Sequence, residues 1–168
     1  MACNIIEGSA IACRDSIGGI KTIYIAQSAD ISSVTESSGV VTAINMMPSK
    51  KFWTFEMEKE NAMMEEKEIG SVENGTLYWE QSLTFTIKKL AANQRNNMKI
   101  LAQNRLVVVV LDSNGTYWLL GRYNGLDKIG ANTSKTGKAF GDLNGYEIAL
   151  LGKETNPMFS VTGTIPTT

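Results

Sequence analysis

The stretch TLYWEQSLTFTIKK, residues 76–89, decides the fold. Its apolar side chains recur at every second position, so one face of an extended chain carries Leu77, Trp79, Leu83, Phe85 and Ile87. The opposite face is polar and carries Thr76, Tyr78, Glu80, Ser82, Thr84, Thr86 and Lys88. The alternation predicts a strand with one buried face, longer than most strands. A long strand with a continuous polar face favours a large sheet or a barrel.

Runs of β-branched and aromatic residues predict further strands on both sides of this one. We expect them over 21–26, 40–46, 52–60, 106–111, 117–121 and 146–151, with a last edge strand over 158–161. The segment 106–111 is apolar on both faces, which is typical of a central strand, and the turn at 112–115 joins it to 117–121 in a hairpin. Small polar residues and glycine predict loops over 27–39 and 122–144, the second with room for a short strand.

Two segments flank the long strand. An apolar stripe through Leu90, Met98, Leu101 and Ala102 predicts a helix over 91–104. Residues 61–69 favour a helix by propensity, but the short link before them and the Glu73-Asn74-Gly75 turn after them permit a returning strand. We expect this segment to form an extended hairpin arm.

The predicted fold is therefore mainly β (α+β). It is an antiparallel β-sandwich or barrel with one flanking α-helix and an extended hairpin arm. We expect an N-terminal arm over 1–19, a single domain over 20–161 and a loosely held tail over 162–168.

Composition excludes several classes of function. The 168 residues include no histidine, which removes Ser-His-Asp and Cys-His catalysis and most zinc enzymes. Two cysteines, Cys3 and Cys13, are too few for a four-ligand zinc site. A net charge of −1 disfavours a dedicated nucleic-acid binder. No apolar run approaches the roughly 20 residues that span a bilayer, and the first residues lack the pattern of a secretory signal. We expect no cofactor, no metal and no membrane partner.

Carboxylates are the main candidates for catalysis. Glu56, Glu58 and Glu60 share one face of the strand expected over 52–60, and paired carboxylates can hydrolyse glycosides. Their even spacing is more typical of a solvated face, and no calcium-loop pattern accompanies them. We therefore expect no enzymatic activity. Trp53, Trp79 and Trp118 fall on expected strands and are interpreted as core or interface anchors.

Charge is segregated along the chain. Glutamates dominate residues 56–73, whereas every charged residue from 88 to 105 is basic. The two surfaces either neutralise each other within one monomer or meet head to tail between subunits, an arrangement that builds rings and filaments. The candidates for a contact between subunits are Lys88, Lys89, Arg95, Lys99, Glu65, Glu66 and Glu68.

A second candidate surface follows if strands 52–60 and 76–89 pair through the arm. Their polar faces then form one acidic-to-neutral surface, along which a polyanion slides without being retained. Its residues are Glu56, Glu58, Glu60, Tyr78, Glu80, Ser82, Thr84 and Thr86.

The order of elements resembles that of the tail tube proteins of long-tailed bacteriophages. It comprises an N-terminal arm, the segment 13–21 leading into a strand, a hairpin arm, a long strand ending in Lys88-Lys89-Leu90, a helix, the 106–121 hairpin, and a Gly-rich segment with Thr136-Gly137 and Gly141-Asp142 before a closing strand. In that family a β-sandwich or barrel with one helix assembles into hexameric rings that stack into a tube, and inner strands and a long hairpin surround the lumen.

The resemblance implies a structural virion protein, made in the host cytoplasm and located in the tail, whose acidic-to-neutral surface faces the channel for DNA ejection. The implied partners are further copies of the chain, the tape-measure protein, the tail terminator, the baseplate or hub and, in a contractile tail, the sheath. Genomic DNA passes through without specific binding. The alternatives are a neck, terminator or hub ring of the same fold, a soluble β-barrel that binds a small ligand, and a carboxylate hydrolase.

Overall fold

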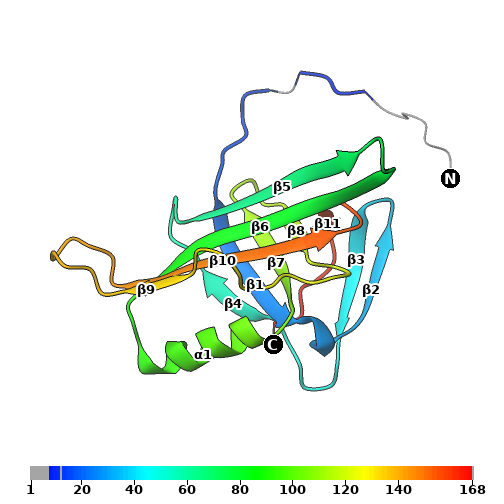
Figure 1. Ribbon diagram of the computed structural model, residues 1–168. Coiled ribbons are helices and arrows are strands. Elements are labelled where there is room, and N and C mark those ends of the chain that lie inside the picture. The colour runs from blue at the N-terminus through cyan, green and yellow to red at the C-terminus, as the bar shows by residue number, and fades with distance from the viewer. Residues whose placement is uncertain (1–7, 12, 168) are drawn as a thin grey trace.

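The computed structural model describes residues 8–11 and 13–167. The chain forms two β-sheets that pack face to face, with one helix beside them (Figure 1). The elements in chain order are β1 Ile20–Gln27, the short 3-10 helix η1 Ser28–Asp30, β2 Ile31–Ser37, β3 Val40–Met46, β4 Trp53–Glu56, β5 Ala62–Ser71, β6 Thr76–Lys88, α1 Ala92–Gln103, β7 Leu106–Asp112, β8 Tyr117–Leu120, β9 Thr133–Lys135, β10 Gly145–Glu154 and β11 Phe159–Val161. The prediction of a mainly β sandwich with a single flanking helix is confirmed.

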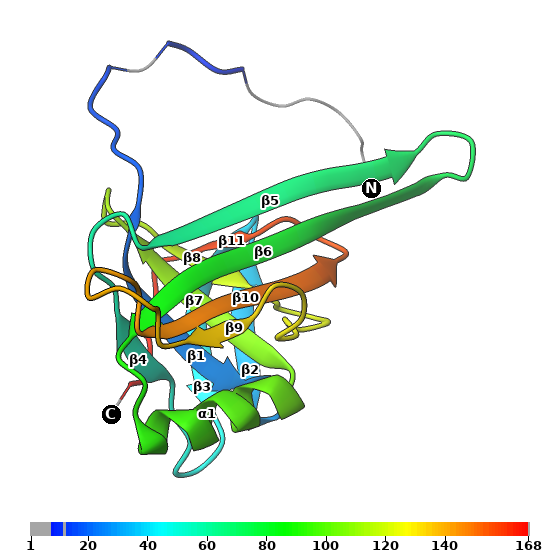
Figure 2. The same ribbon diagram turned by 60° about the vertical axis from the view of Figure 1, so that its left-hand side comes forward.

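The two sheets differ in size. Seven strands form one sheet in the order β2-β3-β11-β8-β7-β1-β4, and four form the other in the order β5-β6-β10-β9. All the pairings are antiparallel except that of β11 with β3. The β5–β6 hairpin projects well beyond the end of β10 (Figure 2). The hairpin arm expected from residues 61–69 is therefore present as a strand.

Strand β7 is the centre of the core, as its apolar sequence predicts. Val108 and Val110 face the four-stranded sheet and pack with Leu83 and Phe85 of β6. The alternate residues of β7 face the opposite side, where a second cluster packs around Phe52. Both faces of β7 are covered, and this is why the strand carries no polar face.

The tail covers part of that second cluster. Ile165 packs against it, the N–H of Thr162 donates to the carbonyl of Val41 at 2.9 Å, and the N–H of Phe52 donates to the carbonyl of Pro166 at 2.9 Å. The described part of the tail, residues 162–167, is thus attached to the sheet rather than loosely held. Of the N-terminal arm, residues 8–11 and 13–19 run away from both sheets and are exposed (Figure 1); residues 1–7 and 12, with Cys3, lie outside the described residues.

Three secondary-structure expectations are wrong. Residues 27–39 contain η1 and β2; β2 is an exposed edge strand with few apolar residues, so its sequence resembles a loop. The strand expected over 52–60 ends at Glu56, because the chain then leaves the seven-stranded sheet and turns at Glu60, whose φ is 60°. Strand β11 is not an edge, because it pairs with β3 on one side and β8 on the other.

Candidate functional site

The surface expected to combine residues 56–60 with the long strand does not form. Strand β4 pairs with β1, where Glu56 lies opposite Thr22, whereas β6 pairs with β5 and β10. Glu58 and Glu60 lie in the connection that carries the chain from one sheet to the other. The predicted pairing of residues 52–60 with β6 is therefore wrong, because the strand that returns against β6 is β5. Glu56 and Glu58 meet only the end of β6, where they line a cleft with Thr86 and Lys88.

The polar side chains of β6 do share one face, as predicted. This face, here called the outer face, is the side of the four-stranded sheet turned away from the core. Strand register places on it Tyr78, Glu80, Ser82, Thr84 and Thr86 of β6 together with Met63, Glu65, Lys67 and Ile69 of β5 and Glu147, Ala149, Leu151 and Lys153 of β10.

Charge on the outer face is balanced rather than acidic. Its glutamates are Glu65, Glu80 and Glu147, and its lysines are Lys67, Lys88, Lys135 and Lys153. Glu58, from the connection before β5, pairs with Lys88 and completes the balance. Lys67 lies 3.3 Å from Glu65, and Lys135 lies 2.7 Å from Glu147. Hydrogen bonds from Lys135 and Thr133 hold the pKa of Glu147 below its ordinary value. Lys67 and Lys135 already pair with carboxylates of the same face, which weakens their attraction for phosphates, whereas Lys153 lies over the ring of Tyr78.

A buried polar network fastens the base of the hairpin to the rest of the chain. Gln81 of β6 is only 2% exposed; its Oε1 accepts from the N–H of Gly121 at 3.0 Å, and its Nε2 donates to Glu66 Oε2 at 3.0 Å. The N–H of Met158 donates to the same Glu66 oxygen at 2.7 Å. Gly121 follows β8 and Met158 precedes β11, so the network joins the two sheets. Glu66, expected at a contact between subunits, is instead engaged inside its own chain.

Glu154 belongs to a neighbouring buried site. Its side chain is 1% exposed and accepts from the backbone N–H groups of Tyr123, Asn124 and Gly125 at 3.1, 2.8 and 3.1 Å. These bonds stabilise the loop after β8. Sequence reasoning missed both Gln81 and Glu154, although a glutamine on the apolar face between Trp79 and Leu83 was a readable signal for the first.

The other candidates for a contact between subunits lie on the surface. Lys88 forms an ion pair with Glu58 of the same chain, and Lys89 follows it with a φ of 69°. Arg95 and Lys99 are exposed on α1, which carries no acidic residue. Glu68 is exposed on β5 near the end of the hairpin, and Glu65 is on the outer face.

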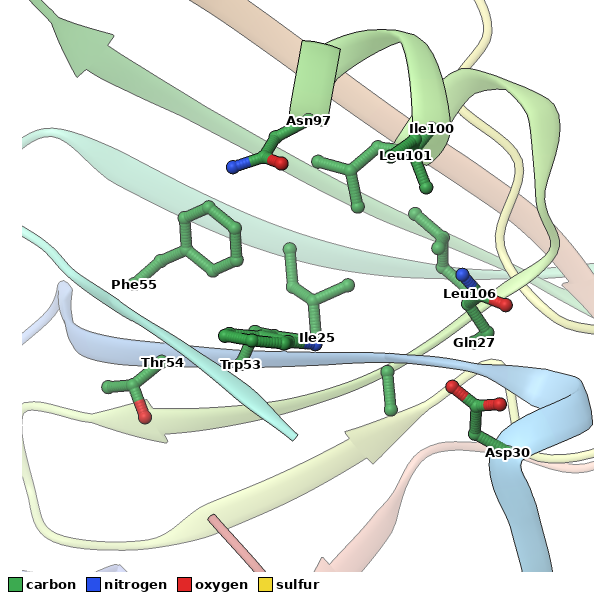
Figure 3. A pocket seen from close by; sticks show the side chains of 11 residues that line it. Ile25, Gln27, Asp30, Trp53, Thr54, Phe55, Asn97, Ile100, Leu101 and Leu106 are labelled. Carbon is green, nitrogen blue, oxygen red and sulfur yellow. The ribbon is translucent and has the colours of Figure 1, made fainter. Parts of the chain in front are cut away.

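An apolar groove lies between α1 and the β1–β4 edge of the seven-stranded sheet. Its volume is about 450 Å³. Figure 3 shows Ile25, Trp53 and Phe55 on the sheet side, facing Ile100 and Leu101 of α1. Trp53 is 63% exposed, so of the two expected roles, core anchor and interface anchor, the first is wrong for this residue and the second stays a prediction. Asp30 lies at one end of the groove, where it pairs with Lys50 at 3.1 Å.

A second cleft, lined mainly by polar residues, lies next to this groove. Its volume is about 490 Å³, and it includes Glu56 and Glu58 beside the amides of α1. Glu58 is paired with Lys88 there, so one of the two carboxylates already has a cationic partner.

Segments that project from the body carry large apolar side chains into solvent. Ile11 of the N-terminal arm, Val72 of the β5–β6 turn and Phe140 of the β9–β10 loop are fully exposed. Leu77, on the part of β6 beyond β10, is 53% exposed. Residues 69–78 are called here the hairpin tip. A single exposed apolar side chain is normal on a protein surface; what these three share is their position on segments that project from the body.

The β7–β8 turn anchors the base of the N-terminal arm. The N–H of Ile17 donates to Asn114 Oδ1 at 3.0 Å, and Asn114 Nδ2 donates to the carbonyl of Ile17 at 2.9 Å. Asp112 stabilises this turn. Burial acts to raise its pKa, but hydrogen bonds from Trp118 Nε1 and from the N–H groups of Thr116 and Asn114 outweigh burial and hold the pKa below the ordinary value.

Within residues 8–11 and 13–167, no group of three or more Cys, Asp or Glu side chains is arranged to hold a metal ion. No helix in the same residues is long and apolar enough to cross a membrane. Cys13 is exposed, not buried as a small apolar residue would be. Comparisons with family models, curated proteins and solved structures find no match to this chain.

Proposed function

We propose that this chain is a structural subunit that assembles with copies of itself into rings stacked as a tube, as in the tail tube of a long-tailed bacteriophage. The observation that carries the proposal is the contrast between a filled sandwich and its projecting segments. The interior between the sheets is packed, whereas Ile11, Val72 and Phe140 are fully exposed on three separate protrusions. A neighbouring copy that contacts these segments would cover such side chains, which no part of the same sandwich reaches.

The outer face supports the same function and suggests which surface surrounds the channel. It is built from the longest strand and its neighbours, most of its side chains are polar, and its lysines are balanced by glutamates. In a ring, we expect the four-stranded sheets of adjacent copies to face the lumen. This assignment keeps Glu80, which the sequence already predicted for the channel wall, and replaces Glu56, Glu58 and Glu60 with Glu65 and Glu147.

Assembly is tested by negative-stain imaging and sedimentation velocity of the purified chain over a range of concentrations. Rings or tubes with a central channel are the expected result. A compact monomer at every concentration would refute the proposal and would favour a ligand-binding module that uses the apolar groove. A short stack of rings would favour the neck, terminator or hub alternative.

The orientation of the wall is tested by cysteine labelling in a Cys3→Ser, Cys13→Ser background. Thr84→Cys places a thiol on the outer face, and Thr35→Cys places a matched exposed thiol on edge strand β2. In tubes, a small maleimide should label both, but a bulky polyethylene-glycol maleimide should label only the Thr35→Cys variant. Equal labelling of both by the bulky reagent would place the outer face on the outside of the tube.

A further inference from the structure

Strand β4 is an edge of the seven-stranded sheet, and part of its main chain is open there. The N–H of Met57, just after β4, donates to the carbonyl of Lys21 on β1 at 3.0 Å. Antiparallel strands bond at every second residue, so the N–H and C=O groups of Thr54 and Glu56 point away from β1. An open edge of this kind binds an extended segment through main-chain hydrogen bonds.

Open space follows this edge along its whole length. The apolar groove borders residues 53–55, and the neighbouring polar cleft borders residues 54–58. Asn97 of α1 lines both hollows, so they adjoin each other between the helix and β4. Trp53 and Phe55 point into the groove (Figure 3), and by alternation the other two residues of β4 lie on its opposite face. An extended segment on this edge would place alternate side chains in the groove.

The three apolar protrusions differ in whether their main chain is free to pair. The two strands of the hairpin pair with each other. The β9–β10 loop is closed on itself, because the N–H groups of Lys138 and Ala139 both donate to Asp142 at 2.8 Å. In the arm, residues 8–11 and 13–16 belong to no strand and form no main-chain hydrogen bond within the described part of the chain. Of these three protrusions, the arm is therefore the one that can add to a strand edge.

The side chains of the arm fit this edge in one register. Ile11 and Arg14 are three residues apart, as are Trp53 and Glu56, and residues three apart point to opposite faces of an extended chain. In a strand parallel to β4, Ile11 beside Trp53 therefore places Arg14 beside Glu56. Arg14 and Glu56 are both exposed, and neither forms an ion pair within the described residues. This register buries the apolar side chain and joins opposite charges.

The arm of one copy does not reach this position on its own β4. The N–H of Ile17 is bound by Asn114 of the β7–β8 turn, and the arm continues away from both sheets (Figure 2). Glu56 lies opposite Thr22, which is five residues after Ile17. Ile17 therefore lies about 15 Å beyond the level of Glu56, whereas the three residues from Ile17 to Arg14 span at most about 10 Å. The contact must form between copies, and it is heterologous, because each copy gives an arm to one neighbour and receives one from another.

We propose that the N-terminal arm of one copy adds to the free edge of β4 in the next copy as a parallel strand, with Ile11 in the apolar groove beside Trp53 and Arg14 beside Glu56. This inference rests on the proposed function, because it specifies one contact between copies of the chain. Main-chain hydrogen bonds hold the arm, and the groove selects an apolar side chain.

Proline at position 54 tests the main-chain pairing. Thr54 is exposed and its N–H points away from β1, so Thr54→Pro should fold, but it removes a donor that the arm needs. We expect assembly at least tenfold weaker than wild type by sedimentation velocity. Thr54→Val is the matched control, because it keeps the N–H and should assemble like wild type. Urea unfolding verifies that both variants fold. A folded Thr54→Pro that assembles as well as Thr54→Val overturns the proposal.

Cross-linking tests the register and the exchange between copies. In the Cys3→Ser, Cys13→Ser background, a tagged Arg14→Cys chain is mixed with a Glu56→Cys chain and treated with a short bismaleimide. The expected product is a cross-linked heterodimer on a denaturing gel. Thr35→Cys, on edge strand β2, replaces Glu56→Cys in the control and should give none. Equal cross-linking to both sites, or a cross-link within one chain of the Arg14→Cys, Glu56→Cys double variant, overturns the proposal.

Trp53 provides a readout of groove occupation. Its side chain is 63% exposed in one copy, and a docked arm should cover it. Acrylamide quenching, measured as the difference between wild type and Trp53→Phe, should fall on assembly and also when a synthetic peptide of residues 4–17 is added to the full chain. The same peptide with Ile11→Lys should leave quenching unchanged.

The outcomes separate this contact from the proposed function. If copies assemble while quenching of Trp53 stays at the monomer value, the arm does not occupy the groove, and the proposed function stands on other contacts. If both peptides act alike on Trp53, the groove does not select Ile11, and the docking proposal fails. A wild type that never assembles refutes both proposals.

Discussion

Replacing Gln81 by leucine should destabilise the fold, although the change puts an apolar side chain on an apolar face. Gln81 is buried on the core side of β6, and its amide supplies the partner of two buried groups. In Gln81→Leu the N–H of Gly121 loses its acceptor, which costs about 1–3 kcal/mol. The Glu66 carboxylate keeps the N–H of Met158 but loses its other donor. That lost bond to a charged group costs about 1.5–3 kcal/mol more. After roughly 1.5 kcal/mol is subtracted for the apolar gain of leucine, we expect a net loss of about 1–4.5 kcal/mol.

The measurement is urea unfolding followed by tryptophan fluorescence, at a protein concentration where sedimentation shows a monomer. Ser82→Ala is the matched control, because the neighbouring Ser82 points to the outer face and its substitution should cost within about 0.5 kcal/mol. Gln81→Glu keeps an acceptor for Gly121 but adds a carboxylate beside Glu66, so its destabilisation should shrink as the pH falls and one carboxylate is protonated. A Gln81→Leu protein as stable as the Ser82→Ala control would refute the proposed role of this network.

Three further predictions concern the core, the turn and the wall. In urea unfolding, Phe85→Ala should lower the free energy of unfolding by about 3–5 kcal/mol, because Phe85 packs in the core. Trp79→Ala should lower it by less than half as much, because Trp79 is only half-buried where the hairpin leaves the core. Equal losses would show that the core extends to Trp79. The pKa of Asp112 is lower in the folded state than its unfolded value of about 3.8, so the carboxylate stabilises the fold above that pH, and the stabilisation is lost as the pH falls through the folded value. Asp112→Asn should therefore be less stable than wild type at pH 7, and its stability should fall less steeply in acid. An unchanged acid limb of the pH–stability curve would contradict this. Tubes with all three outer-face glutamates changed to glutamine should retain double-stranded DNA at low salt while wild-type tubes do not, as measured by co-sedimentation, and equal retention would argue against a channel wall.

The periodicity of apolar residues was sufficient to predict most of the strands, because the two faces of each strand lie in different environments. The alternation of β6 and the doubly apolar sequence of β7 each predict one arrangement, and the structure contains both. Strand β2 was missed because an edge strand with solvent on most sides needs few apolar residues. The position of β11 was missed for the opposite reason, because a segment as short as Phe159–Val161 gives no indication of how many neighbours it has.

The candidate surfaces depend on which strands are paired, and alternation does not determine pairing. Residues 52–56 alternate and residues 62–71 do not, yet the second segment is the one that pairs with β6. What decides between them is the turn at Glu60, a non-glycine residue with positive φ, which no pattern at that position predicts. The choice moves Glu56, Glu58 and Glu60 off the proposed wall and brings Lys67 and Lys153 onto it.

The hairpin tip links the stability of one copy to its assembly. Beyond Trp79 the ribbon has no third strand, since β10 ends opposite that residue. A two-stranded ribbon is marginally stable in water, so the tip gains little from its own hydrogen bonds. The Gln81 network holds the base of the ribbon against β8 and β11, which fixes its direction without covering its end. In the proposed assembly, a neighbouring copy that covers the tip would supply the missing layer. The segment that is least supported in the monomer would then be the one that assembly stabilises most.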